Sequence, residues 1–352
     1  MGCGGAQGVL HKLVWKLRDY FDITILTLFD KKFYELPADV KYQPLSPVKG
    51  IKGFIFGGYT VAYFNLKKLI DKEHPTIISF LEFSNFMNLS LNKDKAIISF
   101  RTCLDFFDGK GLLNWFYRGT IKSLYPKAKQ IIVNCESNKQ DLIQKLKIPA
   151  DKIKVIYNPI DLSSIPKKAE RIDDERRFIS IGRLCKQKNF DLLIKSFKNL
   201  VIANPNNKLC IIGDGKEKDY LQSLINLHKL DDNIFLKGEI KDIYDALKKS
   251  DYFIFSSKAE GFPNVLIEAM AVGLPIITSD FPISAKEIIQ NGQNGVLLSL
   301  DNYGTELCDV YLKLNELKQN KAGIEKFDIS KVVGEWKKLI QENQTNQAKN
   351  QN

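Results

Sequence analysis

Short apolar runs alternate with longer amphipathic stretches along most of the 352-residue chain. The runs are rich in Ile, Leu, Val and Phe, which is typical of buried parallel strands, and the stretches between them follow helical spacing. We expect strands at residues 22–29, 76–81, 96–100, 130–134 and 152–157, and again at 177–181, 208–212, 233–237, 252–256, 275–279 and 295–298. This alternation predicts an α/β protein built from two doubly wound, Rossmann-like domains.

A chain of 352 residues is long enough for two domains. The boundary is expected near Asn158, because Pro159 disfavours helix at the residue before it and a polar linker follows. We therefore predict an N-terminal domain at 1–158 and a C-terminal domain at 159–328. A last helix at 329–341 is expected to pack back onto the N-terminal domain, and the amide-rich tail at 343–352 to be disordered.

The start of the chain departs from the doubly wound pattern. A glycine turn (Gly2, Gly4, Gly5) leads into a helix at 6–17, but the strand that normally feeds such a turn is missing. Either the chain is truncated, or its start was chosen too late, or the sheet has lost a strand. Gln7 also breaks the G-x-G-x-x-G spacing, which disfavours a nicotinamide-dependent dehydrogenase.

Composition and charge exclude several classes of protein. No apolar run approaches the roughly 20 residues of a membrane span, and Met-Gly-Cys-Gly-Gly lacks the pattern of a signal peptide. The six cysteines are scattered, the three histidines are not spaced as metal ligands, and no D-x-D triplet occurs, so zinc sites and disulfide frameworks are disfavoured and a reducing cytoplasm is expected. The net charge of +11 favours an anionic partner, although it could serve solubility alone. No nucleic-acid-binding motif accompanies it.

Two carboxylates mark the candidate site. Glu260 follows the strand expected at 252–256, and Glu268 lies in the helix that follows. Ligands of open α/β sheets bind at the carboxyl ends of strands, where helix N-termini attract phosphate. Carboxylates repel phosphate but accept hydrogen bonds from hydroxyl groups, so this arrangement indicates a pocket for a nucleotide sugar.

The same residues resemble a known family, the retaining GT-B glycosyltransferases of family four, in which two Rossmann-like domains face a cleft. The resemblance rests on Gly182-Arg183-Leu184 with Lys188-Asn189, on the Gly213-Asp214-Gly215 turn, and on the segment from Glu260 through Glu268 to Ala271. The stretch from Leu124 to Asp161 is similar to bacterial N-acetylhexosamine transferases of the N-acetylgalactosamine type, which extend polyprenyl-diphosphate-linked glycans.

The resemblance implies a role for each matching residue. Arg183 and Lys188 would stabilise the departing diphosphate without a metal, Glu268 would bind the ribose, and Glu260 the transferred hexose. Other donor contacts would come from Gly4, Gly5, Gly182, Gly261, Phe262, Pro263, Asn264 and Val265. Arg101, at the end of the strand at 96–100, would lie near the reacting sugar and the acceptor. A structural salt bridge is the alternative for Arg101, and Glu82 is a similar candidate at the end of the preceding strand.

The N-terminal half combines lysines with aromatic residues, at 49–59, at 63–68 and at 112–118. Such a surface suits the anionic inner face of the cytoplasmic membrane or a lipid-linked acceptor, unless the aromatics are core residues. We therefore expect a peripheral cytoplasmic enzyme that moves an N-acetylhexosamine from a UDP-sugar to a lipid-linked glycan or lipopolysaccharide-type acceptor. The alternatives are a hexosyltransferase of lipopolysaccharide core or capsule assembly, and a truncated nucleotide-sugar-binding protein without activity.

Overall fold

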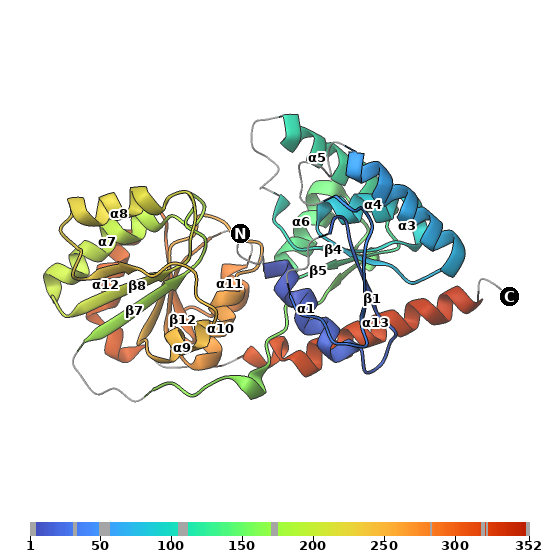
Figure 1. Ribbon diagram of the computed structural model, residues 1–352. Helices are drawn as coiled ribbons and strands as arrows, with labels where there is room; N and C mark the ends of the chain where they lie inside the picture. The colour runs from blue at the N-terminus through green and yellow to red at the C-terminus, as the bar shows by residue number, and fades with distance from the viewer. Residues whose placement is uncertain are drawn as a thin grey trace. The chain divides into compact units, whose positions relative to one another are not determined.

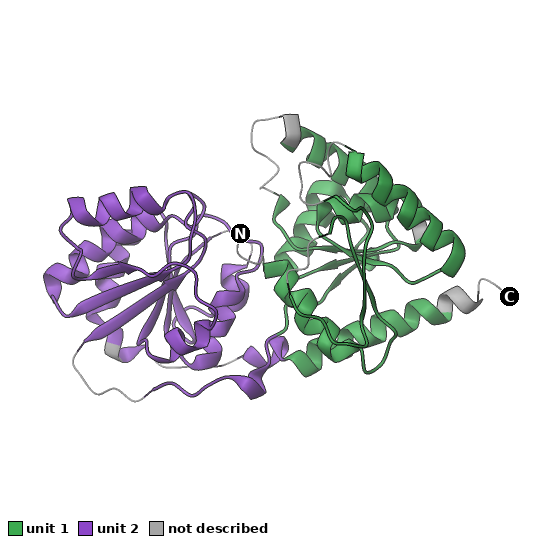
Figure 2. Cartoon of the chain, viewed as in Figure 1, with its two compact units in different colours: residues 1–159, 329–352 green, residues 160–328 purple. Residues whose placement is uncertain are grey.

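The computed structural model describes residues 5–30, 34–48, 57–104, 112–169, 175–281, 284–317, 321 and 323–349. The chain divides into two compact units (Figure 2). Unit 1 consists of residues 1–159 and 329–352, and unit 2 consists of residues 160–328. The boundary expected from the sequence lies one position earlier, after Asn158 rather than after Pro159.

Unit 2 is a doubly wound α/β domain with one parallel sheet in the order β12-β11-β10-β7-β8-β9 (Figure 1). Its elements are β7 (Arg176–Ile181), α7 (Phe190–Ala203), β8 (Asn207–Ile212), α8 (Lys218–Leu227), β9 (Ile234–Leu236), α9 (Ile243–Lys248), β10 (Tyr252–Phe255), α10 (Asn264–Val272), β11 (Ile276–Ser279), α11 (Ala285–Ile288), β12 (Gly295–Leu298) and α12 (Tyr303–Leu312), with 3₁₀ turns at Leu162–Ser164, Leu314–Glu316 and Ile324–Phe327. The chain runs outward from β7 through β8 to β9 and then returns to the other side of β7 with β10. The strand order therefore reverses between β7 and β10, which is where such sheets bind ligands.

The core of unit 2 follows from the apolar strands. Residues of β7, β8, β10 and β11 are buried against one face of α7, α8 and α12, with Phe178, Phe197 and Tyr252 in ring contact. On β10, all four residues are buried, as expected for a central parallel strand covered on both faces. This packing makes the strand ends on either side of the reversal a rigid base for the loops that follow.

Unit 1 carries its helices on both sides of a parallel sheet in the order β3-β4-β5-β6, and β1 and β2 form a separate parallel pair. Its elements are α1 (Gly5–Leu17), β1 (Thr24–Thr27), β2 (Lys41–Pro44), α3 (Tyr59–Glu73), β3 (Ile78–Phe80), α4 (Glu82–Asn92), β4 (Ile97–Phe100), α5 (Leu112–Leu124), β5 (Gln130–Val133), α6 (Glu136–Leu146), β6 (Ile153–Val155) and α13 (Ile329–Lys349), with 3₁₀ turns at Lys93–Lys95, Tyr125–Lys127 and Ala150–Lys152. The helices α1 and α13 share one core with Ile97 and Ile132, whereas α4, α5 and α6 cover the other face.

The strands of unit 1 do not form one continuous sheet. Within the described ranges, no strand joins β1 to β3, and the four residues of β1 are at most half-buried, whereas those of β4 are all buried. The described part of the chain opens directly with α1.

Two expectations from the sequence differ from the structure. The short strand β2 was not predicted, because Lys41-Tyr-Gln-Pro44 alternates weakly and stands among prolines. The tail was expected to be disordered from residue 343, but α13 continues to Lys349, so that expectation is wrong for 343–349. The amide of Asn343 is buried and donates to the carbonyl of Leu339 at 2.8 Å, and the Gln, Glu, Ala and Lys residues around it favour helix.

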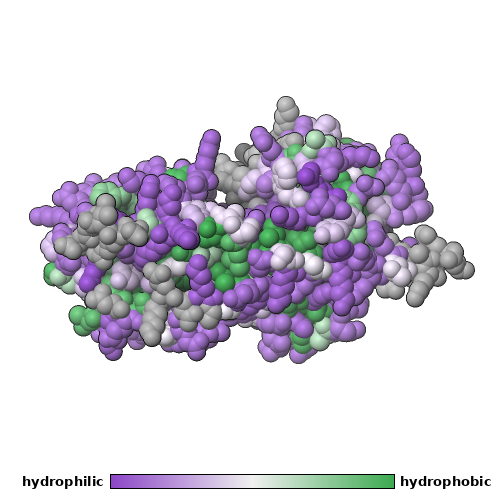
Figure 3. All heavy atoms as spheres, turned by 90° about the horizontal axis from the view of Figure 1, so that it is seen from below, coloured by the Kyte–Doolittle hydropathy of each residue, from purple (hydrophilic) through white to green (hydrophobic). Residues whose placement is uncertain are grey.

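The surface agrees with a chain of which 26% of the residues are charged. Hydrophilic residues dominate the face of the molecule shown in Figure 3, with smaller hydrophobic areas between them. In the described part of the chain, no helix has both the length and the apolar character that crossing a bilayer requires.

Candidate functional site

The residues singled out in the C-terminal half come from two loops at the carboxyl edge of the unit 2 sheet. One loop follows β7 and holds Gly182, Arg183 and Lys188, and the other follows β10 and holds Glu260. Because β7 and β10 are paired neighbours, the two loops leave the sheet side by side. They do so at the reversal of strand order, so a ligand site is expected there.

Backbone contacts with the turn after β8 fix the first loop. The amide of Gly182 donates to the carbonyl of Ile212, and that of Leu184 to the carbonyl of Asp214, both at 2.9 Å. Gly213 has φ +145°, and a Cβ atom there would lie 1.9 Å from the carbonyl oxygen of Gly182, so only glycine fits. Arg183 stands exposed between the two anchored residues and forms no ion pair within the described residues.

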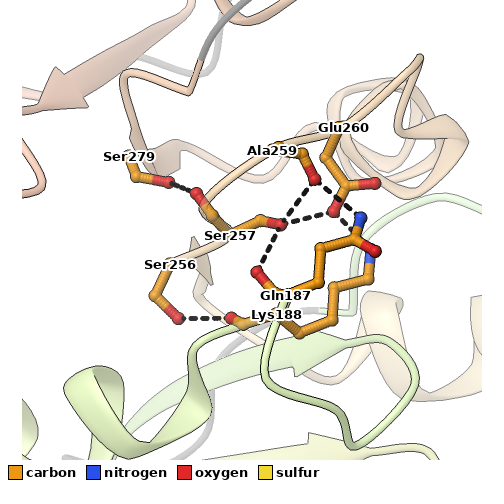
Figure 4. A network of polar contacts seen from close by, with 7 residues as sticks. All are labelled: Gln187, Lys188, Ser256, Ser257, Ala259, Glu260 and Ser279. Carbon is orange, nitrogen blue, oxygen red and sulfur yellow. Dashed lines mark hydrogen bonds and ion pairs between the residues drawn. The ribbon is translucent and has the colours of Figure 1, made fainter. Parts of the chain in front are cut away.

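An ion pair joins the two loops (Figure 4). The Nζ atom of Lys188 donates to Oε1 of Glu260 at 2.6 Å, and the hydroxyl of Ser257 donates to the same oxygen at 2.5 Å. The two charged side chains are only 15% and 10% exposed, and Nζ lies 4.8 Å from the ring centre of Phe255. In the part of the chain that the structure describes, Oε2 of Glu260 makes no hydrogen bond. That oxygen can accept one from a ligand hydroxyl.

Further hydrogen bonds hold the backbone of both loops. The side-chain amide of Gln187 donates to the carbonyl of Ala259 at 2.7 Å, and the Ser256 hydroxyl to the carbonyl of Lys188 at 3.0 Å. The hydroxyl of Ser279, at the end of β11, donates to the carbonyl of Ser257 at 2.7 Å (Figure 4). The sequence analysis missed Gln187 and Ser257. The signal available for Ser257 was its position directly after a buried strand at the ligand-binding edge.

The helix α10 points its N-terminus at the same region. Gly261, Phe262 and Pro263 are buried, and Asn264, Val265 and Glu268 are half-buried on the helix itself. In the described part of the chain, no side chain caps this helix, and its first turn carries no acidic residue. Its N-terminal amides and dipole can therefore attract a phosphate group.

Glu268 lies near a phenol that the sequence analysis did not single out. Burial raises the pKa of Tyr244, and the nearby charges of Glu268, Asp161 and Asp242 raise it further. The phenol of Tyr244 thus stays neutral beside the carboxylate of Glu268.

The remaining candidates lie in unit 1. Arg101 follows β4, and its partners are neutral: it donates to the hydroxyl of Ser99 and to the side-chain oxygen of Asn158. The salt bridge considered as an alternative is absent from the described residues. Gly5 is the exposed first residue of α1, and Gly4 lies outside the described residues. The structure thus brings Lys188 and Glu260 into contact within unit 2, whereas Arg101 and Gly5 belong to the other unit.

No cluster of three or more His, Cys, Asp or Glu side chains within the described ranges could hold a metal ion. Arg183 and Lys188 are the two cations that the sequence analysis assigned to this site.

Comparison with known proteins identifies the class. The model for glycosyl transferases group 1 matches residues 163–303, and that for Glycosyltransferase Family 4 matches residues 3–164. The chain is 32% identical to the Campylobacter jejuni N-acetylgalactosamine-N,N'-diacetylbacillosaminyl-diphospho-undecaprenol 4-alpha-N-acetylgalactosaminyltransferase, over 92% of this chain and 90% of that protein. The C. jejuni GalNAc-alpha-(1->4)-GalNAc-alpha-(1->3)-diNAcBac-PP-undecaprenol alpha-1,4-N-acetyl-D-galactosaminyltransferase is 25% identical, over 97% and 96%.

The fold agrees with these matches. The crystal structure of Anabaena HepE in complex with UDP superposes with a TM-score of 0.75 at 16% identity, and the match covers 96% of each chain. The two α/β units thus have the fold of a GT-B glycosyltransferase. The chain belongs to the family-four glycosyltransferases of GT-B fold.

The Ser257 hydroxyl should position Glu260 for the sugar. Replacing Ser257 with alanine should lower kcat/KM for the donor about tenfold, because a hydrogen bond to a charged carboxylate contributes about 1.5–3 kcal/mol. The Kd for UDP should not change, since UDP lacks the sugar. Ser223→Ala removes an exposed serine hydroxyl of α8 and is the matched control. A Ser257→Ala enzyme with wild-type donor kinetics would show that Lys188 alone orients the carboxylate.

Proposed function

We propose that the protein transfers an N-acetylhexosamine, with retention at the anomeric carbon, from a UDP-sugar to a saccharide carried on a lipid diphosphate. The observation that carries this proposal is Glu260, which is held at Oε1 by Lys188 and Ser257 while Oε2 is left for a sugar hydroxyl. The C. jejuni relative supports the choice of sugar and acceptor, because its name describes an N-acetylgalactosaminyltransferase acting on a diphospho-undecaprenol glycan.

The donor diphosphate is assigned to the loop after β7 and to the start of α10. Arg183 is exposed and positioned by its anchored neighbours, and Lys188 has three N–H groups, of which Glu260 takes one. Both cations would stabilise the negative charge that grows on the diphosphate as it leaves. The ribose hydroxyls are assigned to Glu268.

In the transfer step, the bond between the anomeric carbon and the phosphate oxygen breaks, and UDP leaves with the electron pair. The acceptor hydroxyl attacks from the same face, and its proton passes to the departing phosphate oxygen. This route requires no protein nucleophile. It also gives Arg183 and Lys188 the role that a metal ion has in other glycosyltransferases.

The test offers the purified protein UDP-GalNAc, UDP-GlcNAc, UDP-galactose and UDP-glucose, each with an undecaprenyl-diphosphate-linked saccharide. We expect transfer from a UDP-N-acetylhexosamine, an α-linkage in the NMR spectrum of the product, and unchanged rates in EDTA. A β-linkage would contradict retention, and activity that is lost in EDTA and restored by Mn²⁺ would contradict the metal-free mechanism. Transfer from UDP-galactose or UDP-glucose alone would favour the hexosyltransferase, and UDP-sugar binding without transfer the inactive binding protein.

Glu268→Ala should raise the Kd for UDP about tenfold or more, because hydrogen bonds to a charged acceptor contribute about 1.5–3 kcal/mol. Isothermal titration with UDP measures the effect. Asp309→Ala removes an exposed carboxylate of α12 in the same unit, and should leave the Kd unchanged. If Glu268→Ala binds UDP as the wild type does, Glu268 does not contact the nucleotide.

We further propose that α5 and α3 dock unit 1 on an anionic membrane surface. Trp115 and Phe116 on α5 are 73% and 53% exposed, and Phe64 on α3 is 62% exposed. Both helices also carry basic residues, among them Arg118, Lys122, Lys67 and Lys68. Exposed aromatics next to basic residues favour the interface of an anionic leaflet.

Replacing Trp115 with alanine should weaken binding to vesicles that contain phosphatidylglycerol by about tenfold, since burial of a large apolar side chain contributes about 1.5–3 kcal/mol. Vesicle co-sedimentation measures the change. Tyr220→Ala removes an aromatic residue that is 47% exposed on α8 of unit 2, and should have no effect. If the wild-type protein does not co-sediment with such vesicles at low salt, the membrane proposal is contradicted.

A further inference from the structure

Buried polar atoms without a partner gather at one edge of the unit 1 sheet. Within the described residues, Oε1 of Glu82, Oδ1 of Asn85 and Nη2 of Arg101 are buried and make no hydrogen bond. Such atoms are rare in native proteins, because a buried polar group that is left unpaired loses its hydrogen bonds to water without replacement. Three of them at the same edge of the sheet suggest that a ligand completes their hydrogen bonds.

The strand register explains why these atoms come together. Phe80 of β3 is the register partner of Ser99 of β4. Glu82 and Arg101 each follow two residues later, so both leave the sheet at its carboxyl edge, where α/β sheets bind ligands. The amide of Asn85 donates to the carbonyl of Ser99 and to the hydroxyl of Tyr125, both at 3.1 Å, which ties the start of α4 to the end of β4.

The guanidinium group of Arg101 is buried, and among the residues that the structure describes it has no counter-charge. Its Nε donates to the Ser99 hydroxyl at 2.7 Å and its Nη1 to Asn158, and both partners are neutral. The rings of Phe80 and Trp336 lie 5.3 Å and 5.9 Å from the guanidinium carbon. Burial lowers the pKa of Arg101 to about 9, so the group remains a cation at neutral pH. Its Nη2 keeps donors for a ligand oxygen.

Glu82 complements Arg101 from the neighbouring strand end but does not pair with it. Burial raises the pKa of Glu82, and its charge in turn raises the pKa values of Tyr117 and Tyr125. These tyrosines belong to the core on the α4 and α5 side, whereas Phe80 and Trp336 beside Arg101 belong to the core on the α13 side. A carboxyl group and a guanidinium cation therefore lie at the same edge of the sheet, each with different neighbours.

The backbone before Glu82 is strained. Leu81 has φ 71° and ψ 157°, a conformation that is almost confined to glycine and is unfavourable for leucine. The Leu81 side chain is 37% exposed, so burial of this side chain compensates little of the backbone strain. This backbone conformation directly precedes Glu82, the first residue of α4. Strained residues of this kind cluster at binding sites.

We propose that Glu82 and Arg101 together bind one sugar ring of the acceptor, with Oε1 of Glu82 accepting a hydrogen bond from a ring hydroxyl and Nη2 of Arg101 donating to a neighbouring oxygen. A neutral hydroxyl-rich ring satisfies both groups, whereas a phosphate would satisfy Arg101 and be repelled by an ionised Glu82. This inference rests on the proposed function for the identity of the ligand, and it makes Glu82 a specificity-determining residue.

The test measures binding of methyl N-acetyl-α-D-galactosaminide by saturation-transfer NMR, in wild type, Glu82→Ala, Glu82→Gln and Ser84→Ala. Ser84 is a half-buried neighbour in the same turn of α4 and serves as the matched control. We expect the signal to fall about tenfold in Glu82→Ala, to survive in part in Glu82→Gln, whose amide oxygen still accepts, and to persist in Ser84→Ala. In the transfer assay, the acceptor KM should rise about tenfold in Glu82→Ala with the Kd for UDP unchanged.

The two readouts separate the two proposals. If the wild type transfers no sugar yet binds the saccharide through Glu82, the proposed function fails and the sugar site stands. A wild-type signal that Glu82→Ala and Glu82→Gln leave unchanged would overturn the site, as would the absence of any wild-type signal. Melting temperatures identify variants that fold poorly, and in that case Glu82→Gln alone decides.

Discussion

Replacing Lys188 with alanine is expected to reduce kcat by about 10²-fold or more at saturating donor. Two losses combine in this variant. The departing diphosphate loses a cation, and the Glu260 carboxylate, 10% exposed, keeps only Ser257 as a donor to Oε1. A buried charge that loses its partner is strongly destabilised, so the Glu260 side chain is expected to move from its present position. Steady-state kinetics with UDP-N-acetylhexosamine and the lipid-linked acceptor measure the change.

Lys186→Ala provides the matched control, because Lys186 stands exposed on the same loop. It changes the net charge of unit 2 equally without touching Glu260. If both variants lose activity to the same extent, general electrostatics rather than the placed ammonium group supports the reaction. A Lys188→Ala enzyme with wild-type kcat would remove Lys188 from the transfer step.

Gly213→Ala should abolish most activity and lower the melting temperature of the protein. The added Cβ atom would lie 1.9 Å from the carbonyl oxygen of Gly182, so the backbone on one side must move. The φ angle of +145° is itself unfavourable for alanine, at a cost of about 1–3 kcal/mol. Because Gly182 precedes Arg183, the displacement should misplace the candidate diphosphate contact as well. Thermal unfolding and donor kinetics on the same sample report both effects.

Gly238→Ala serves as a control that separates the effect of backbone strain from that of the steric clash with Gly182. Gly238 has φ +69°, and a Cβ atom added there would meet nothing within 4 Å, so alanine at this position suffers the unfavourable backbone angle without the clash. We expect a smaller fall in melting temperature and nearly normal kcat. Equal losses in the two variants would indicate that backbone strain, and not contact with Gly182, makes glycine necessary at 213.

The sequence predicted the parts of the fold that depend on local pattern. The buried strand β10 is a continuous apolar run, and β4 is apolar apart from Ser99, so their positions follow from the residues alone. The strand β2 could not be found in this way, because it is short, half-exposed and stabilised by its pairing with β1. The extension of α13 was missed for a related reason. A polar composition suggested disorder, but the buried Asn343 bonds within the helix.

The candidate site could be predicted as a set of residues but not as a set of contacts. Spacing and resemblance placed Arg183, Lys188 and Glu260 in one region. They did not indicate that Lys188 and Glu260 pair, or that Ser257 shares the same carboxylate oxygen. Lys188 and Glu260 are 72 positions apart in the chain, and their contact depends on the pairing of β7 with β10. Long-range pairings of this kind follow from the assembled sheet and not from any local stretch.

The return of the last helix to unit 1 has a consequence for synthesis on the ribosome. Trp336 on α13 is 1% exposed and completes a core with Val9 and Leu13 of α1. Domains usually fold in the order in which they emerge, but this core lacks α13 until residues 329–349 have been made. Unit 2, which is continuous from 160 to 328, can therefore close first. Until α13 is made, the apolar residues of unit 1 that it covers remain exposed in the nascent chain. We expect chaperone binding to matter most during this interval.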